Sequence, residues 1–228
     1  MSRGKRFPLF ALVIIGLTAL YLLFWPVPIS PGAWTPGVAP PLTGQYEQNF
    51  GLANIERLSL GEGFAPEDVA IDSQNRVYAG FDDGRIMRLR PDRTNPELFA
   101  NTQGRPLGLK FDKGGRLIVA DANKGLLSID HDGAMKVLGT QADGLPFRCT
   151  NDLDIAADGT IYFTDASSKF PLSSYKADLL EHQPNGRFLA YDPRSNTTRV
   201  VMSNIHFANG VAVSPDQSFV LVVETGRY

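Results

Sequence analysis

The chain begins with a long uninterrupted apolar segment. Residues 7–25 carry no charged side chain, a basic cluster lies within residues 1–6, and the next basic residue is Arg57. As a helix these residues would rise about 28 Å, close to the thickness of a hydrocarbon core. The apolar core of a cleaved signal peptide is shorter and ends in small residues. The pattern therefore predicts a single-pass signal anchor over 7–25, with residues 1–6 cytoplasmic and the remainder extracytoplasmic.

A proline-rich segment follows. Residues 26–45 contain six prolines, which disfavour a helix or a central strand. We expect an extended stalk here. The folded domain is then expected over residues 46–228.

The rest of the chain contains a repeated pattern of polar and apolar positions. Four segments align without gaps: 66–72, 106–112, 150–156 and 208–214. Each is followed by a turn rich in Asp, Asn, Gly or Ser and then by a second short apolar run. Strand, turn and strand at a period near 40 residues is typical of the blades of a β-propeller.

The competing fold is a parallel α/β sheet, which requires a helix between successive strands. Helical character is confined to residues 175–182, inside an insertion over 167–187 of the third repeat. The fold expected is therefore all-β. The insertion is either a lid over the mouth of the propeller channel or a surface clip on the third blade.

The alignment accounts for three blades and the first strands of a fourth. A closed propeller has four to eight blades. We therefore expect the propeller over 46–228 to be incomplete at its C-terminal end, with about three and a half blades present.

Composition narrows the classes of function. There are 22 basic and 24 acidic residues, with a net charge of −2, which argues against nucleic acid as a partner. The single cysteine, Cys149, excludes an intrachain disulfide and a zinc site built from several cysteines. We expect it to pack in the core rather than to act as a nucleophile.

Oxygen-bearing side chains recur at one position of the repeat. The second column of the alignment contains Glu67, Leu107, Asn151 and Asn209. Equivalent positions in successive blades surround one axis, so Glu67, Asn151 and Asn209 should meet at one mouth of the channel. One carboxylate and two amide carbonyls form a hard oxygen set that suits Ca²⁺.

The third column suggests a second site. It contains Asp68 and Asp152, which should point to the opposite side of the strand from their neighbours. We expect them to hold a second calcium ion deeper in the channel, completed by a backbone carbonyl near Leu109. Asn and Asp before a strand are also common turn residues, which is the structural alternative for any single position.

Several motifs together resemble a known family. They are Glu67-Asp68, Arg105–Leu109, Asn151–Asp154, Ile161–Asp165 and Phe207–Asp216. In this order they resemble the strictosidine synthase-like group, which includes the adipocyte plasma membrane-associated proteins and belongs with the gluconolactonase and paraoxonase superfamily. The resemblance implies a six-bladed propeller with calcium in its channel and, for many members, hydrolysis of lactones or aryl esters.

The resemblance also assigns residues by position. Glu67, Asn151 and Asn209 match the catalytic-calcium ligands of paraoxonase-like enzymes, and Asp68 and Asp152 match the structural-calcium ligands. Leu107 stands where paraoxonases have a catalytic histidine, so no catalytic residue is assigned. The glutamate that strictosidine synthase uses lies in later blades, so that activity is neither transferred nor excluded.

Three hypotheses for function follow. The first is a membrane-anchored, calcium-dependent hydrolase acting on a small-molecule ester or lactone, with Ca²⁺ polarising the carbonyl group. The second is an enzyme of the strictosidine synthase type that condenses an amine with an aldehyde. The third is a membrane-tethered propeller without catalytic activity that binds a partner.

Overall fold

The computed structural model describes residues 3–227, with side chains from residue 9 onward. The chain forms two units, Met1–Ser30 and Pro31–Tyr228. The first unit contains helix α1 (Arg3–Phe24). Within the described residues no helix combines the length and the apolar character that a membrane crossing requires, so the transmembrane span expected over 7–25 is not supported. Met1 and Ser2 of the expected cytoplasmic tail lie outside the described residues.

Residues 26–43 of the proline-rich segment contain no helix or strand, and the short 3₁₀ helix η1 (Gly44–Tyr46) follows. No strand occurs in the described chain before Val69. The sheets therefore begin well after residue 46, where the folded domain was expected to start at the end of the proline-rich segment.

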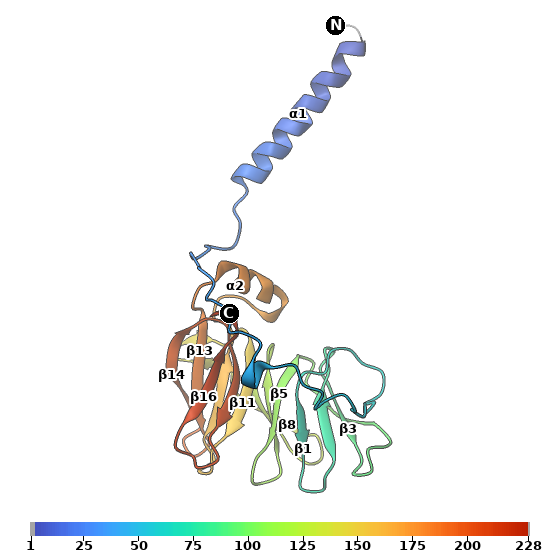
Figure 1. The fold of residues 1–228 in the computed structure, drawn as a ribbon, viewed down its shortest axis with the longest axis vertical. Coiled ribbons are helices and arrows are strands. Elements are labelled where there is room, and N and C mark those ends of the chain that lie inside the picture. Colours follow the sequence, from blue (N-terminus) through green and yellow to red (C-terminus); the bar gives the residue numbers. More distant parts are fainter. Residues whose placement is uncertain (1–2, 228) are drawn as a thin grey trace. The chain divides into compact units, whose positions relative to one another are not determined.

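The second unit is built from antiparallel sheets (Figure 1). The first sheet contains β1 (Val69–Ile71), β2 (Val77–Gly80), β3 (Arg85–Leu89) and β4 (Glu97–Asn101). The second contains β5 (Pro106–Phe111), β6 (Leu117–Asp121), β7 (Gly125–Ile129) and β8 (Met135–Gly139). The third contains β11 (Thr150–Ile155), β12 (Ile161–Asp165), β13 (Gly186–Asp192) and β14 (Thr197–Ile205). A fourth sheet has two strands, β15 (Ala208–Val213) and β16 (Val220–Glu224), and a short hairpin is formed by β9 (Gln141–Ala142) and β10 (Leu145–Pro146).

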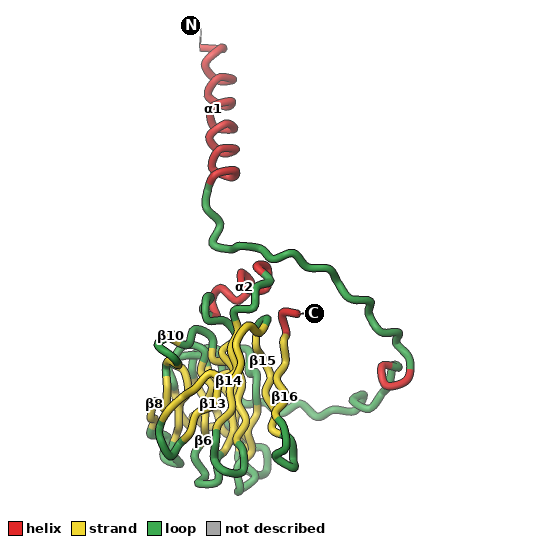
Figure 2. Tube along the Cα trace, turned by 90° about the vertical axis from the view of Figure 1, so that its left-hand side faces the viewer, coloured by secondary structure: helices red, strands yellow, loops and turns green. Residues whose placement is uncertain are grey.

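The first strand of each sheet lies beside the first strand of the next. Contacts join β1 to β5, β5 to β11 and β11 to β15, and the sheets stand side by side in Figures 1 and 2. Strands in each four-stranded sheet follow chain order and are antiparallel to their neighbours. This is the arrangement of propeller blades. The prediction of three blades and the first strands of a fourth is confirmed.

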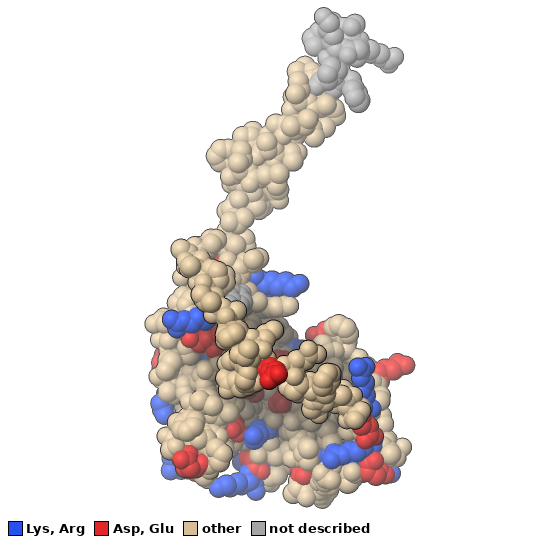
Figure 3. Space-filling view, viewed as in Figure 1, with Lys and Arg blue, Asp and Glu red and all other residues tan. Residues whose placement is uncertain are grey.

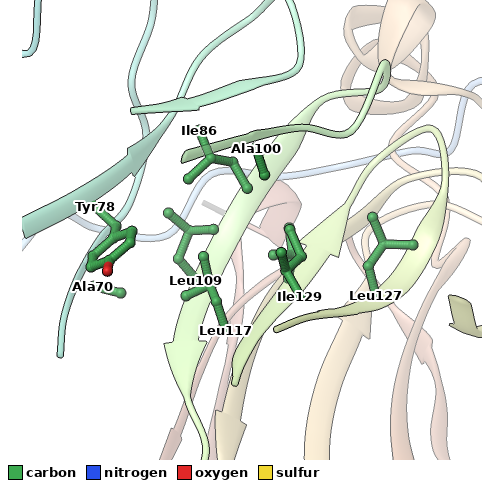
Figure 4. Packing of buried hydrophobic residues seen from close by; sticks show 9 residues of the cluster. Ala70, Tyr78, Ile86, Ala100, Leu109, Leu117, Leu127 and Ile129 are labelled. Carbon is green, nitrogen blue, oxygen red and sulfur yellow. The ribbon is translucent and has the colours of Figure 1, made fainter. Parts of the chain in front are cut away.

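Apolar side chains fill the spaces between neighbouring blades. Between the first and second blades, Tyr78, Ile86, Leu109 and Ile129 belong to one buried cluster (Figure 4). Every residue of β6 and of β7 is buried, because the second blade is covered by a blade on each face. Burial of such a side chain stabilises the fold by about 1.5–3 kcal/mol. The stacking of blades therefore holds the first strand of each blade, its inner strand, in place.

Charged side chains of both signs are interspersed on the face shown in Figure 3. This mixture agrees with the net charge of −2. No single-sign field covers the described surface in that view. The sequence-based exclusion of nucleic acid remains a prediction.

Candidate functional site

The predicted ligand column coincides with irregularities in the inner strands. The register shifts between Pro106 and Gly108 in β5, between Thr150 and Leu153 in β11, and between Ala208 and Val211 in β15. Leu107, Asn151 and Asn209 lie within these three shifts. A β-bulge bends its strand and re-aims side chains. The sequence signal was present, since Asn-Asp and Asn-Gly interrupt apolar strands.

One side chain fixes two of these bulges together. Thr164 of β12 is fully buried. Its Oγ1 accepts a hydrogen bond from Asp152 N at 3.2 Å and donates one to the backbone oxygen of Asn209 at 2.6 Å. The bulges that carry Asn151 and Asn209 are thus tied to one hydroxyl group. The sequence analysis did not single out this threonine.

The predicted first set lies on one cavity. A pocket of about 630 Å³ is lined by Glu67, Asn151 and Asn209, together with Leu107. A smaller cavity of about 180 Å³ shares these residues and is also lined by Asp68 and Asp152. The structure therefore brings all five predicted ligands to the wall of one cavity.

The carboxylate of Glu67 lies in an unfavourable environment for its charge. Loss of hydration raises the pKa of Glu67, the nearby Arg105 guanidinium opposes the rise, and the negative charges of Asp152 and Asp68 add to it. The side chain is nevertheless accessible from the cavity. A cation placed among these acids would relieve their repulsion.

The two asparagines differ in their surroundings. Asn151 is 6% exposed, and its side-chain amide makes no hydrogen bond within the described part of the chain. Asn209 is partly exposed and donates from Nδ2 to Thr225 Oγ1 at 3.0 Å. The polar atoms of the Asn151 amide are not sealed from solvent, so they are available to a ligand in the cavity that the residue lines.

Asp68 and Asp152 act as ties between blades. Asp68 Oδ1 accepts a hydrogen bond from Val69 N and its Oδ2 accepts one from Leu109 N, both at 2.7 Å. Asp152 Oδ1 accepts from Leu153 N and its Oδ2 from Val211 N, both at 2.8 Å. Leu109 thus presents its N–H to Asp68, where the sequence analysis expected a backbone carbonyl facing a metal ion.

The electrostatics of Asp152 agree with a crowded acidic environment. Burial raises its pKa, the hydrogen bonds from Val211 and Leu153 lower it, and the charges of Asp68 and Asp154 raise it again. Among the described residues no group of three or more His, Cys, Asp or Glu side chains is arranged to hold a metal ion. The predicted channel-mouth set, which has one carboxylate and two amides, is a different donor set.

Arg105, known from the sequence only as part of a family motif, is a pocket residue. It is 7% exposed and lines the larger pocket. Its Nη2 donates to the backbone oxygen of Ala65 at 2.7 Å, and its Nε lies 3.4 Å from Asp82 Oδ1. The side chain therefore links the segment before Glu67 to the second blade.

A repeated acid supports the segment that leads into the inner strand of the second, third and fourth blades. The acid stands at the end of the second strand of a blade. It accepts a hydrogen bond from a backbone N–H that lies one or two residues before the inner strand of the same blade. The pairs are Asp121 with Arg105 N at 2.9 Å, Asp165 with Cys149 N at 2.8 Å and Glu224 with His206 N at 3.0 Å. Sequence comparison of the four repeats could have found this column.

Cys149 has no features of a nucleophile. It is 1% exposed, and burial raises the pKa of its thiol to about 12. The thiolate is the reactive form. Cys149 packs with Leu107 and Phe207, which agrees with the expected core role.

The insertion of the third repeat both clips onto the blade and walls the pocket. It contains η2 (Leu172–Ser174) and α2 (Tyr175–Glu181). Within the insertion, buried Asp178 accepts a hydrogen bond from Ser167 Oγ at 2.5 Å. Leu172 and Leu179 pack against a buried cluster that contains Leu107 and Cys149, which attaches the insertion to the blades. Leu172 and Tyr175 line the larger pocket. The two interpretations that the sequence left open are therefore compatible.

Comparisons with known proteins identify the family. The blades, with polar side chains from successive inner strands on one cavity, define a β-propeller. A gluconolactonase from Xanthomonas campestris superposes with a TM-score of 0.60 at 23% identity, covering 72% of this chain and 56% of that one. A calcium-binding regucalcin from Agrobacterium tumefaciens superposes with a TM-score of 0.57 at 14% identity, covering 74% and 53%. These likenesses show the fold.

Sequence comparison gives the narrower assignment. Residues 44–89 match the strictosidine synthase-like N-terminal family and residues 151–228 match the strictosidine synthase family. Protein strictosidine synthase-like 7 of Arabidopsis thaliana is 40% identical over 81% of this chain and 48% of its own length. An adipocyte plasma membrane-associated protein of Salmo salar is 32% identical over 97% and 58%. The chain belongs to the strictosidine synthase-like family and spans about half the length of these relatives.

Proposed function

We propose that this chain is part of a calcium-dependent hydrolase of lactones or aryl esters, built on a six-bladed propeller. The observation that carries the proposal is the meeting of Glu67, Asn151 and Asn209 on one cavity. The propeller relatives include a gluconolactonase and a calcium-binding regucalcin. Leu107 leaves the general base unassigned.

The donor set fits calcium. Glu67 supplies the formal charge, and Asn151 and Asn209 each supply an amide on the wall of the same cavity. These are hard oxygen donors of the kind that Ca²⁺ takes. Bound there, the ion would act as a Lewis acid toward a carbonyl oxygen.

The chain's own residues bind and orient the substrate. The pocket combines the polar column with apolar side chains of Leu107, Leu172 and Phe207. The apolar wall excludes water from one side of a bound ester, and Tyr175 of the insertion also lines the pocket. Asp68 and Asp152 keep the inner strands in register by their ties to the next blade.

The decisive experiment measures calcium binding by calorimetry on the wild-type chain and on Glu67→Gln. The substitution keeps the shape and removes the formal charge of the set, so we expect calcium affinity to fall about tenfold or more. Asp82→Asn, which removes an acid from the same pocket outside the ligand set, is the matched control and should bind calcium nearly as wild type. Equal affinity for wild type and Glu67→Gln would overturn the calcium site.

Activity is tested separately on a panel of lactones and aryl esters, with and without a chelator. Hydrolysis that the chelator abolishes supports the proposal. Condensation of an amine with an aldehyde in the same assays, unaffected by the chelator, would favour the second hypothesis. Calcium binding without turnover of any substrate would favour a binding propeller.

We also propose that the N-terminal segment associates with a membrane and leaves the propeller on the extracytoplasmic side. The proposal rests on the apolar residues 7–25 after a basic cluster and on relatives named for the adipocyte plasma membrane. Flotation of the whole chain with phosphatidylcholine vesicles tests it. Ile14→Lys with Leu17→Lys should abolish flotation, and unchanged flotation of this variant would contradict it. Orientation is tested by fusing alkaline phosphatase after Pro40. The reporter is active only on the extracytoplasmic side, so we expect the fusion to be active.

A further inference from the structure

The guanidinium group of Arg105 is buried beside the pocket with part of its hydrogen-bonding capacity unused. Arg105 is 7% exposed, and its Nη1 has no hydrogen-bond partner among the described residues. The other two nitrogens face Ala65 O at 2.7 Å and Asp82 Oδ1 at 3.4 Å. A buried charged donor without an acceptor costs more than a neutral one, so this position calls for an acceptor that the described chain does not supply.

The charge of Arg105 is distinctive within the pocket. Among the described lining residues it is the one with a positive charge, and the acids Glu67 and Asp82 are the others that carry charge. The Asp82 side chain is 63% exposed and its contact with Nε is long, so it neutralises the guanidinium only in part. The planar fork of a guanidinium matches the geometry of a carboxylate or a phosphate, and of the two a carboxylate brings the smaller negative charge into a pocket that already contains Glu67 and Asp82.

The other residues that line the pocket indicate the chemical character of the rest of the ligand. Phe64, Leu107, Leu172 and Phe207 give the pocket an apolar surface, and its volume is about 630 Å³. Pockets of this size take small molecules and orient them with a few polar groups. An aromatic or alkyl body on this wall would place an anionic end at Arg105.

We propose that Arg105 is a specificity-determining residue whose guanidinium group binds the carboxylate of an apolar small molecule. The inference deepens the proposed function, because it names a carboxylate-bearing substrate class for the same pocket. It does not depend on a metal ion or on turnover. The carboxylate accepts hydrogen bonds from Arg105 while the body of the molecule covers the apolar wall.

The test compares two probes of equal shape, 3-phenylpropanoate and its neutral amide, 3-phenylpropanamide. Binding of each is measured by calorimetry on the whole chain in a chelator. Wild type should prefer the carboxylate by about tenfold, which corresponds to about 1.4 kcal/mol. Arg105→Gln should lose this preference. Arg148→Gln removes the same charge from an exposed side chain outside the pocket and should keep it.

A second variant protects the test against misfolding of Arg105→Gln. Asp82→Asn removes the acid that competes for the guanidinium and leaves Arg105 unchanged, so it should raise carboxylate affinity about two- to threefold and leave the amide unaffected. Equal binding of the two probes by wild type, no saturable binding of either, a retained preference in folded Arg105→Gln, or no effect of Asp82→Asn would each overturn the inference. If Glu67→Gln leaves calcium binding intact but the carboxylate preference depends on Arg105, the calcium proposal fails and this one stands.

Discussion

Asp68 of the first blade accepts a hydrogen bond from the backbone N–H of Leu109 in the second blade, with 2.7 Å between Oδ2 and N. Asp152 forms the corresponding tie to Val211, from the third blade to the fourth, at 2.8 Å. Both aspartates occupy the same column of the repeat. The column therefore joins successive blades at the level of the cavity.

The first prediction tests whether Asp68 is a tie or a calcium ligand. Asp68→Ala removes both backbone hydrogen bonds of the carboxylate and should lower the free energy of unfolding by about 1.5–3 kcal/mol, because the acceptor is charged. Asp68→Asn keeps one oxygen acceptor and should lose less. Urea unfolding in the presence of a chelator measures both.

Repeating the Asp68 measurements with calcium separates the two roles. A tie predicts the same loss with and without the ion. If Asp68→Ala destabilises the chain only when calcium is present, the second calcium site expected from the sequence is supported and the tie is contradicted as the main role.

The second prediction concerns two glycines in the column that contains Asp68 and Asp152. A Cβ atom on Gly108 would lie 2.8 Å from Asp152 Cα and 3.1 Å from the backbone oxygen of Asn151. Backbone atoms cannot yield to this contact, so Gly108→Ala should destabilise the fold by about 1–3 kcal/mol. The absence of a side chain at this position in the second blade lets Asp152 approach β5.

Gly210→Ala is the matched control for Gly108→Ala. Its added Cβ would meet Val223 Cγ2 at 3.4 Å, which is an ordinary contact, so the change in unfolding free energy should stay within about 0.5 kcal/mol. Thermal unfolding of the two variants provides the comparison. Equal effects would show that the close approach of Asp152 to Gly108 does not limit this position.

The repeats predicted much of the fold because each blade places equivalent apolar positions in equivalent strands. They also predicted that Glu67, Asn151 and Asn209 share one cavity, since residues in one column surround one axis. The bulges at Asn151 and Asn209 were not predicted, because alternation alone cannot locate an extra residue in a strand.

The roles of Arg105 and Thr164 depend on contacts between blades. Arg105 reaches Ala65, which lies 40 residues away, and Thr164 reaches Asn209, which lies 45 residues away. The pattern of residues within one repeat cannot indicate partners that lie in another blade.

The last prediction concerns the cost of keeping Glu67 ionised in the pocket. Its pKa is raised, chiefly by loss of hydration and also by the charges of Asp152 and Asp68, although Arg105 opposes the rise. A carboxyl group whose pKa is higher in the folded than in the unfolded state destabilises the fold when ionised. This destabilisation is present above the raised folded-state pKa and disappears as the pH falls below the unfolded-state value near 4.5.

Urea unfolding in a chelator tests this. At neutral pH the free energy of unfolding of Glu67→Gln should exceed that of wild type by roughly 0.5 kcal/mol, a small difference because the side chain is exposed and its charge is screened. At pH 3 the difference should vanish, because Glu67 is then neutral in both states. Calcium should reverse the order at neutral pH, since the ion stabilises only the chain that binds it. A variant that is less stable than wild type in the chelator would show that the Glu67 carboxylate is already compensated within the protein, and the electrostatic case for a cation at this site would be lost.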